Sequence, residues 1–204
     1  MKSEKFYNID YFENGKNSGK SNYVGYKWNE DKYSEQVDFI ETLAGIQPPL
    51  SVLDFGCAKG FLVNALRSKG YSAIGQDISE YAIQMAMSEV REYCHLVSGV
   101  NAVADGPSFD LICSVHLLEH FSLAYVKQAV GILLQSTKKA VFLIPVGNGS
   151  RFNNPVHEND PSHVLRETPD WWGELFANSG AKSITVKDFR TFGGKSDVVG
   201  WCVS

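Results

Sequence analysis

The chain has 204 residues, of which 44% are hydrophobic and 21% are charged. This length suits one domain with a sizeable core, and the composition is ordinary for a globular protein, which excludes a disordered, collagen-like or coiled-coil chain. The formal net charge of −4 disfavours a nucleic-acid partner, because a surface that binds a duplex usually needs an excess of basic residues.

The sequence shows neither a membrane span nor a secretory signal. Its longest apolar runs, such as residues 140–146, are far shorter than the roughly 18 residues of a spanning helix. The N-terminal residues MKSEKFYN lack the apolar core of a signal peptide. We therefore expect a soluble, cytoplasmic protein. No Cys-x-x-Cys pair occurs, and we interpret the cysteines as buried free thiols: Cys57, Cys94, Cys113 and Cys202.

Residues 1–50 are polar and rich in aromatic side chains. Aromatic residues outside a periodic pattern form either a strap packed on a domain or the wall of a ligand pocket, and both can hold at once. A helical pattern of apolar residues follows from residue 37, and Pro48-Pro49 should end that helix. We therefore divide the chain into an N-terminal lid or strap with its helix (1–50) and one domain (51–204). The early aromatic residues are Phe6, Tyr7, Tyr11, Phe12, Tyr23, Tyr26, Trp28 and Tyr33.

Beyond residue 50, strand and helix patterns alternate. Nearly uninterrupted apolar strands separated by helices are typical of a parallel sheet covered on both faces, so the predicted fold class is α/β, doubly wound and Rossmann-like. The segment 146–167 has no pattern and is typical of a lid or binding loop. The predicted strands are 51–55, 71–76, 94–98, 109–115, 140–144, 183–186 and 198–203, and the predicted helices are 61–69, 79 to about 90, 123–135 and 168–180.

The turn Asp54-Phe-Gly-Cys-Ala-Lys-Gly60 joins the first strand to its helix. Small residues there let a ligand approach the backbone, and the helix N-terminus offers free N–H groups. The spacing does not fit a Gly-x-Gly-x-x-Gly dinucleotide fingerprint, because Phe61 occupies the third glycine position. Asp77 ends the next strand, 77 − 56 = 21 residues after Gly56, where a carboxylate can accept two hydrogen bonds from a ribose diol. The alternative for Asp77 is a cap of the following helix.

These motifs resemble the class I S-adenosylmethionine-dependent methyltransferases. The resemblance runs over residues 52–60, 74–79 and 109–121 and also extends to 159–163 and 168–180, so that together these segments cover roughly residues 52–180. The sequence is similar in particular to small-molecule methyltransferases, including the ubiquinone-pathway O-methyltransferases. The resemblance implies a seven-stranded, mostly parallel sheet with an antiparallel last strand, and S-adenosyl-L-methionine as the cofactor. The cofactor-binding residues that it implies are Asp54, Gly56, Ala58, Gly60, Asp77, Ile78, Val100, Asn101, Ser114, Val115 and His116.

Three histidines are candidates for the catalytic role. Methyl transfer needs alignment of the acceptor with the methyl group and, for a hydroxyl acceptor, removal of a proton, for which histidine titrates in the useful range. We predict that His116, His120 or His163 is the general base or orients the substrate. The alternative role for His120 is a structural hydrogen bond, and the alternative role for His163 is an anchor of the lid. We interpret His157 and His95 as surface or packing residues.

The leading prediction is a methyltransferase that acts on oxygen or nitrogen of a small molecule, because only residues 1–50 and one loop are left for recognition. We predict no metal ligands for this function. One alternative is a metal-assisted RNA 2′-O-methyltransferase, because Glu119, His120 and a later histidine resemble the metal ligands of methyltransferases of small-RNA 3′ ends. Others are a non-catalytic cofactor-binding module and a nicotinamide oxidoreductase. We predict no membrane partner, and a homo-oligomer stays open.

Overall fold

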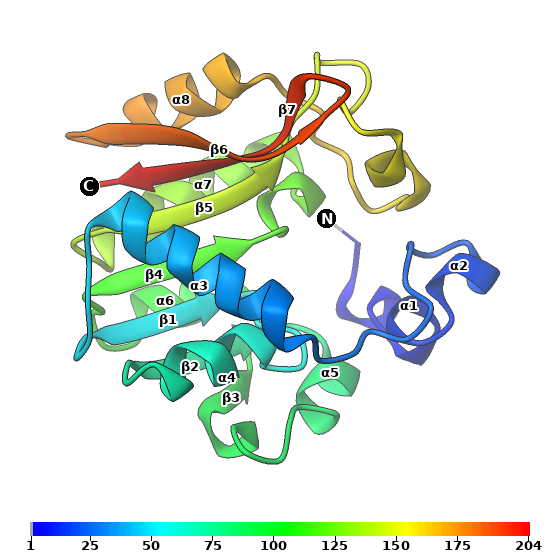
Figure 1. Cartoon of the computed structure of the whole chain (residues 1–204), viewed down its shortest axis with the longest axis horizontal. Helices are drawn as coiled ribbons and strands as arrows, with labels where there is room; N and C mark the ends of the chain where they lie inside the picture. The colour runs from blue at the N-terminus through cyan, green and yellow to red at the C-terminus, as the bar shows by residue number, and fades with distance from the viewer. Residues whose placement is uncertain (1) are drawn as a thin grey trace.

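A seven-stranded sheet forms the centre of the computed structural model, which describes residues 2–204 (Figure 1). Its strand order is β3-β2-β1-β4-β5-β7-β6, and only β7 runs antiparallel to its neighbours. This confirms the predicted α/β, doubly wound sheet with an antiparallel last strand. The strands are β1 (Ser51–Phe55), β2 (Ser72–Asp77), β3 (Cys94–Leu96), β4 (Leu111–Val115), β5 (Ala140–Pro145), β6 (Ile184–Phe192) and β7 (Lys195–Val203).

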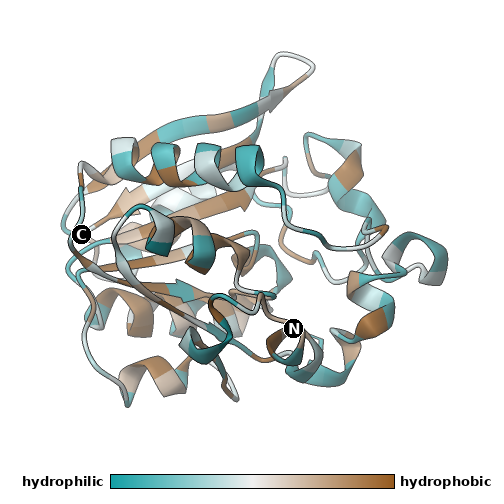
Figure 2. Cartoon of the chain, turned by 60° about the horizontal axis from the view of Figure 1, so that its bottom comes forward, coloured by the Kyte–Doolittle hydropathy of each residue, from teal (hydrophilic) through white to brown (hydrophobic). Residues whose placement is uncertain are grey.

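Helices cover both faces of the sheet, and each face has its own hydrophobic core. The helices α3 (Glu30–Ala44) and α4 (Phe61–Ser68) pack on one face, whereas α6 (Asn101–Ala104), α7 (Leu123–Gln135) and α8 (Pro169–Asn178) lie on the other (Figure 1). Successive strand residues point to opposite faces, so Val52 belongs to the first core and Leu53 to the second. Hydrophobic and hydrophilic residues alternate around the helical turns (Figure 2), as this two-sided packing requires.

Some predicted boundaries were wrong. The helix predicted for 79 to about 90 is the short α5 (Glu80–Gln84), because the Met87 N–H donates to the Lys59 carbonyl at 3.1 Å and the chain turns back to the first loop. The helix α3 begins at Glu30 and ends before Gly45, whose φ of 60° closes it ahead of the prolines. The strand β6 continues to Phe192 and β7 begins at Lys195, so both are longer than the predicted strands 183–186 and 198–203. The prediction missed these residues because the exposed ends of the two strands lack an apolar pattern.

The N-terminal segment packs beside the carboxyl ends of the parallel strands (Figure 1). It contains η1 (Glu4–Phe6), α1 (Ile9–Phe12) and α2 (Gly15–Ser18). The Ser79 hydroxyl donates to the Tyr7 carbonyl at 2.5 Å, and Lys59 forms an ion pair with Glu13. These contacts hold the segment against the domain. No helix among residues 2–204 combines the length and the apolar character needed to cross a membrane.

The second core offers a test of the packing. Phe142 on β5 is completely buried, and its ring stacks on Phe176 of α8 with centroids 4.9 Å apart. We expect Phe142→Ala to lower the free energy of unfolding by about 3–5 kcal/mol, because the substitution leaves a cavity between sheet and helix. Urea denaturation measures this. The matched control, Phe192→Ala, alters a side chain that is 49% exposed, and we expect a change below about 0.5 kcal/mol. Equal effects would contradict this packing.

Candidate functional site

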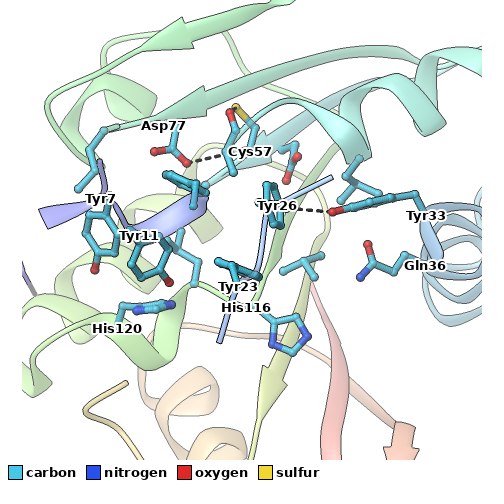
Figure 3. A pocket seen from close by; sticks show the side chains of 18 of the residues that line it. Tyr7, Tyr11, Tyr23, Tyr26, Tyr33, Gln36, Cys57, Asp77, His116 and His120 are labelled. Atoms are coloured by element: carbon cyan, nitrogen blue, oxygen red, sulfur yellow. Dashed lines mark hydrogen bonds between the residues drawn. The ribbon is translucent and has the colours of Figure 1, made fainter. Parts of the chain in front are cut away.

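A cavity of about 110 Å³ lies at the carboxyl ends of β1, β2 and β4. In Figure 3, Asp77 and Cys57 lie on one side of it, His116 and His120 lie on the opposite side, and tyrosines from the N-terminal segment stand between them. Ligands of open α/β sheets bind at this end of the strands. The lining residues from the domain include Asp54, Gly56, Cys57, Ala58, Leu62, Asp77, Ile78, Val115, His116, Leu117 and His120.

The loop after β1 is shaped by backbone conformations that only small residues adopt easily. Gly56 has φ of 90°, and a Cβ there would lie 2.7 Å from the Leu117 side chain. Ala58 also has a positive φ, 47°, and its N–H donates to Asp77 Oδ2 at 2.8 Å. The loop therefore presents backbone rather than side chains to the cavity, as a cradle for a ligand requires.

Asp77 connects this loop to the next helix. Its Oδ1 accepts from the Ser79 N–H at 2.8 Å, so both carboxylate oxygens hold backbone while they line the cavity. Burial raises the pKa of Asp77, and the backbone hydrogen bonds from Ser79, Ala58 and Ile78 lower it. Each carboxylate oxygen has a further lone pair, so Asp77 can still accept from a bound diol.

Seven of the predicted cofactor-binding residues line this cavity: Asp54, Gly56, Ala58, Asp77, Ile78, Val115 and His116. The other four do not. Gly60 caps α4 with φ of 72°, and the Val100 side chain lies in the second core. Asn101 is exposed at the first position of α6, and Ser114 is buried with its hydroxyl unpartnered among the described residues.

Tyrosines from residues 1–50 line the cavity between Asp77 and the histidines. They are Tyr7, Tyr11, Tyr23, Tyr26 and Tyr33, none of which the sequence singled out as a site residue. Burial raises the pKa of each, to about 12 for Tyr33, so all keep their proton near neutral pH. The signal that could have found them is the density of aromatic residues before residue 35, which was consistent with a pocket wall. The N-terminal segment therefore supplies part of this lining.

His116 directly follows β4 and has a strained conformation, with φ of 53°. Its side chain is 31% exposed and lines the cavity. Partial burial, helped by the positive charges of Lys32 and Arg190, lowers the pKa of His116 to about 4, so the ring is neutral near pH 7. A neutral imidazole in a ligand cavity can accept a proton.

Four histidines gather at this point of the fold. The rings of His116 and His157 stack at 5.9 Å, and those of His120 and His163 lie 4.5 Å apart. His157 is 5.9 Å from His163, so it belongs to this group although its sequence position had suggested a surface or packing role. His95 is exposed on β3, outside the group.

Glu119 lies buried among these histidines. Its side chain is completely inaccessible, and neither carboxylate oxygen has a hydrogen-bond partner within residues 2–204. Its Oε1 is 3.7 Å from His116 Nδ1 and 3.8 Å from His163 Nε2. Burial raises the pKa of Glu119 to about 7, and His163 opposes this shift. An unpaired buried carboxylate is costly, so a proton or a cation belongs beside it.

Hydrogen bonds fix the histidine rings. His163 Nδ1 lies 2.9 Å from the His157 carbonyl, which can only accept, so Nδ1 carries a proton and Nε2 faces Glu119. The Ser162 hydroxyl donates to Asp160 Oδ1 at 2.5 Å and therefore accepts from His120 Nδ1 at 2.8 Å. One ligand atom from each of Glu119, His120 and His163 lies within 4.8 Å of the others. Two oriented histidines and an orphaned carboxylate fit a divalent cation.

Comparison with known proteins identifies a methyltransferase domain in this chain. The family model of a methyltransferase domain matches residues 27–193. A bifunctional methyltransferase/kinase from Escherichia coli, an O-antigen chain terminator, is 24% identical over 149 residues, which cover 67% of this chain and 21% of the relative. A ubiquinone biosynthesis O-methyltransferase from Alkalilimnicola ehrlichii is 28% identical over 91 residues, which cover 42% of this chain and 37% of the relative. The chain thus spans only about a fifth to two fifths of these curated relatives.

Among solved structures, a SAM dependent methyltransferase from Archaeoglobus fulgidus has the same fold. Its TM-score is 0.72 at 14% sequence identity, and the match covers 86% of this chain and 94% of that chain.

Proposed function

The chain belongs to the methyltransferase domain family, and we propose that it is an enzyme that transfers a methyl group from S-adenosyl-L-methionine to oxygen or nitrogen of a small molecule. The observation that carries this proposal is that Asp77 and His116 face one cavity from opposite sides. The carboxylate suits the ribose diol of the cofactor, and the neutral imidazole suits an acceptor that must lose a proton.

The residues of the cavity divide by chemistry. The Gly56–Ala58 loop and Asp77 would hold the cofactor, which supplies an electrophilic methyl group on sulfonium. His116 would accept the proton of the methyl acceptor at an imidazole nitrogen. Glu119, 3.7 Å from His116 Nδ1, is a positioning residue for this ring. We assign to residues 1–50 the part of a lid or strap, because their tyrosines close the cavity over the domain 51–204 and exclude water.

The test has two stages. Isothermal titration calorimetry with S-adenosyl-L-methionine and with NAD measures which cofactor binds. Transfer of an isotope-labelled methyl group is then followed by mass spectrometry across a panel of phenols, alcohols, amines and quinols. We expect binding of S-adenosyl-L-methionine alone and turnover of at least one acceptor. Binding of NAD alone would overturn the cofactor assignment, and cofactor binding without any turnover would indicate a non-catalytic binding module.

A metal-assisted methyltransferase is the second candidate, and the Glu119, His120 and His163 group favours it. These three side chains would hold the ion, with Ser162 and the His157 carbonyl orienting the two rings from behind. A divalent cation bound there would polarise a coordinated acceptor hydroxyl.

We expect Glu119→Gln to weaken Mn²⁺ binding at least tenfold, because it removes the anionic ligand from the group. Electron paramagnetic resonance of free Mn²⁺ at pH 7.5 measures the affinity. The matched control is Glu158→Gln, which alters a carboxylate paired with Arg166 at 3.0 Å, and we expect its affinity to stay within twofold of wild type. Absence of Mn²⁺ binding to the wild-type protein, or equal binding by both variants, would reject the metal site.

A further inference from the structure

A second hollow, of about 720 Å³, opens directly beside His116. Its walls come from the start of α3, the short helix η4 (Pro155–Asn159), β6 and β7. Lys32, Gln36 and His116 line both this hollow and the cavity described above. A ligand in the second hollow can therefore reach His116 from the side that faces away from Asp77.

Two buried hydrogen-bond acceptors in this wall have no partner among residues 2–204. They are Oε1 of Gln36 and Oδ1 of Asp197, whose residues are 3% and 4% exposed. The other oxygen of Asp197 is fixed, because it accepts from Asn154 Nδ2 at 2.8 Å. A buried acceptor without a donor costs stability, so each of these oxygens needs a donor, which a water molecule or a ligand in the hollow can supply.

The charge of the hollow argues against an anionic ligand. Two basic residues line it, Lys32 and Arg190, and Arg190 is already paired with Glu35 at 2.6 Å. Carboxylates at Asp31, Glu35 and Asp197 outnumber them. A phosphate or carboxylate group would meet no excess of positive charge there.

Hydroxyl groups fit better than an ammonium group. Each hydroxyl donates one hydrogen bond and accepts others, so two neighbouring hydroxyls can satisfy the oxygens of Gln36 and Asp197, and either can also accept from Lys32. An ammonium group donates but cannot accept, and it would face Lys32 with a charge of the same sign. The planar groups of Asn154, Gln36 and Asp197 suit neighbouring hydroxyls in the way that a carboxylate suits a ribose diol.

We propose that this hollow binds a polyhydroxylated part of the methyl acceptor, a sugar, and presents one of its hydroxyls to His116. The methyl transfer rests on the proposed function. In this methyl transfer, the oxygen of the sugar hydroxyl would form a bond to the methyl carbon while the carbon–sulfur bond of the cofactor breaks and its electron pair stays on sulfur. The hydroxyl proton passes to the imidazole of His116.

The experiment measures sugar binding without turnover. The full chain is titrated with methyl α-D-glucopyranoside, methyl α-D-mannopyranoside and methyl β-D-galactopyranoside, alone and with saturating S-adenosylhomocysteine, and binding is followed by amide chemical shifts in NMR spectra. Ethanolamine and inorganic phosphate serve as comparison ligands. We expect at least one glycoside to shift resonances of the hollow with a millimolar Kd, and Asp197→Asn and Gln36→Met each to weaken that binding at least fivefold.

The matched control is Asp188→Asn, on the exposed part of the same hairpin, where Asp188 accepts from the Ser196 hydroxyl at 2.6 Å. We expect this variant to change the Kd of the glycoside twofold or less. Binding of none of the glycosides at 50 mM, binding of ethanolamine or phosphate alone, or glycoside binding untouched by both hollow variants would overturn the proposal. Gln36→Met keeps the test decisive if Asp197→Asn does not fold. Because glycosides are also titrated without the cofactor product, failure of this proposal is separate from loss of cofactor binding.

Discussion

Asp77→Asn is expected to weaken the binding of S-adenosyl-L-methionine by about 100-fold, which corresponds to about 2.7 kcal/mol. The carboxamide retains one acceptor oxygen, whereas both oxygens of Asp77 accept backbone hydrogen bonds, from Ala58 and from Ser79. The amide NH₂ must therefore face one of these N–H donors. The substitution both removes the charge that would hold the ribose diol and distorts the loop that cradles the cofactor.

The measurement is isothermal titration calorimetry, at a temperature where circular dichroism shows the variant to be folded. Asp110→Asn is the control, because Asp110 also uses both carboxylate oxygens as acceptors but lies at the opposite ends of the strands. Its Oδ2 accepts from the Ser51 N–H at 3.0 Å and the Ser51 hydroxyl at 2.8 Å, and its Oδ1 accepts from Lys138 Nζ at 3.1 Å. We expect this control to lose stability but to keep its cofactor affinity within twofold. Equal loss of affinity in both variants would remove Asp77 from the cofactor site.

The sheet was predictable from the sequence because local patterns carry it. Buried strands such as β5 read as apolar runs, and Ser79, Ser122 and Thr168 cap helices through side chains that accept backbone hydrogen bonds. The Gly56 loop was predictable for a related reason, since only small residues tolerate its backbone conformation and the close approach of Leu117. Asp77 followed from its place at the end of a strand.

The rest of the candidate site depends on contacts between distant segments, which no local pattern records. Tyr11 donates at 2.7 Å to Asp160, which is 149 residues further along the chain, and Tyr11 lies on a helix of four residues with little periodicity of its own. His157 joins the histidine group because the patternless segment after β5 folds back, where the Phe152 N–H donates to Glu158 at 2.7 Å. Both oxygens of Glu119 and Oδ1 of Asp197 lack a partner among the described residues, which is likewise a property of their surroundings that residue type alone does not show.

His116→Asn is expected to lower kcat by about 10²- to 10⁴-fold while the Kd of S-adenosyl-L-methionine stays within about threefold of wild type. Asparagine is the appropriate replacement because it adopts the left-handed conformation more readily than most residues, and His116 has φ of 53°. The substitution therefore removes the imidazole with little change in the backbone after β4. It also leaves Glu119 in place, so the metal site can be followed separately in the same variant.

The measurement is single-turnover methyl transfer with an acceptor found in the substrate panel. His95→Asn serves as a control, since His95 is an exposed histidine on β3 outside the cavity lining, and we expect its kcat to match that of wild type. If His116→Asn kept kcat within threefold, proton removal by this ring would be rejected. Catalysis would then depend on alignment of the acceptor or on a cation at Glu119, and a loss of kcat in Glu119→Gln that excess Mn²⁺ restored would favour the cation.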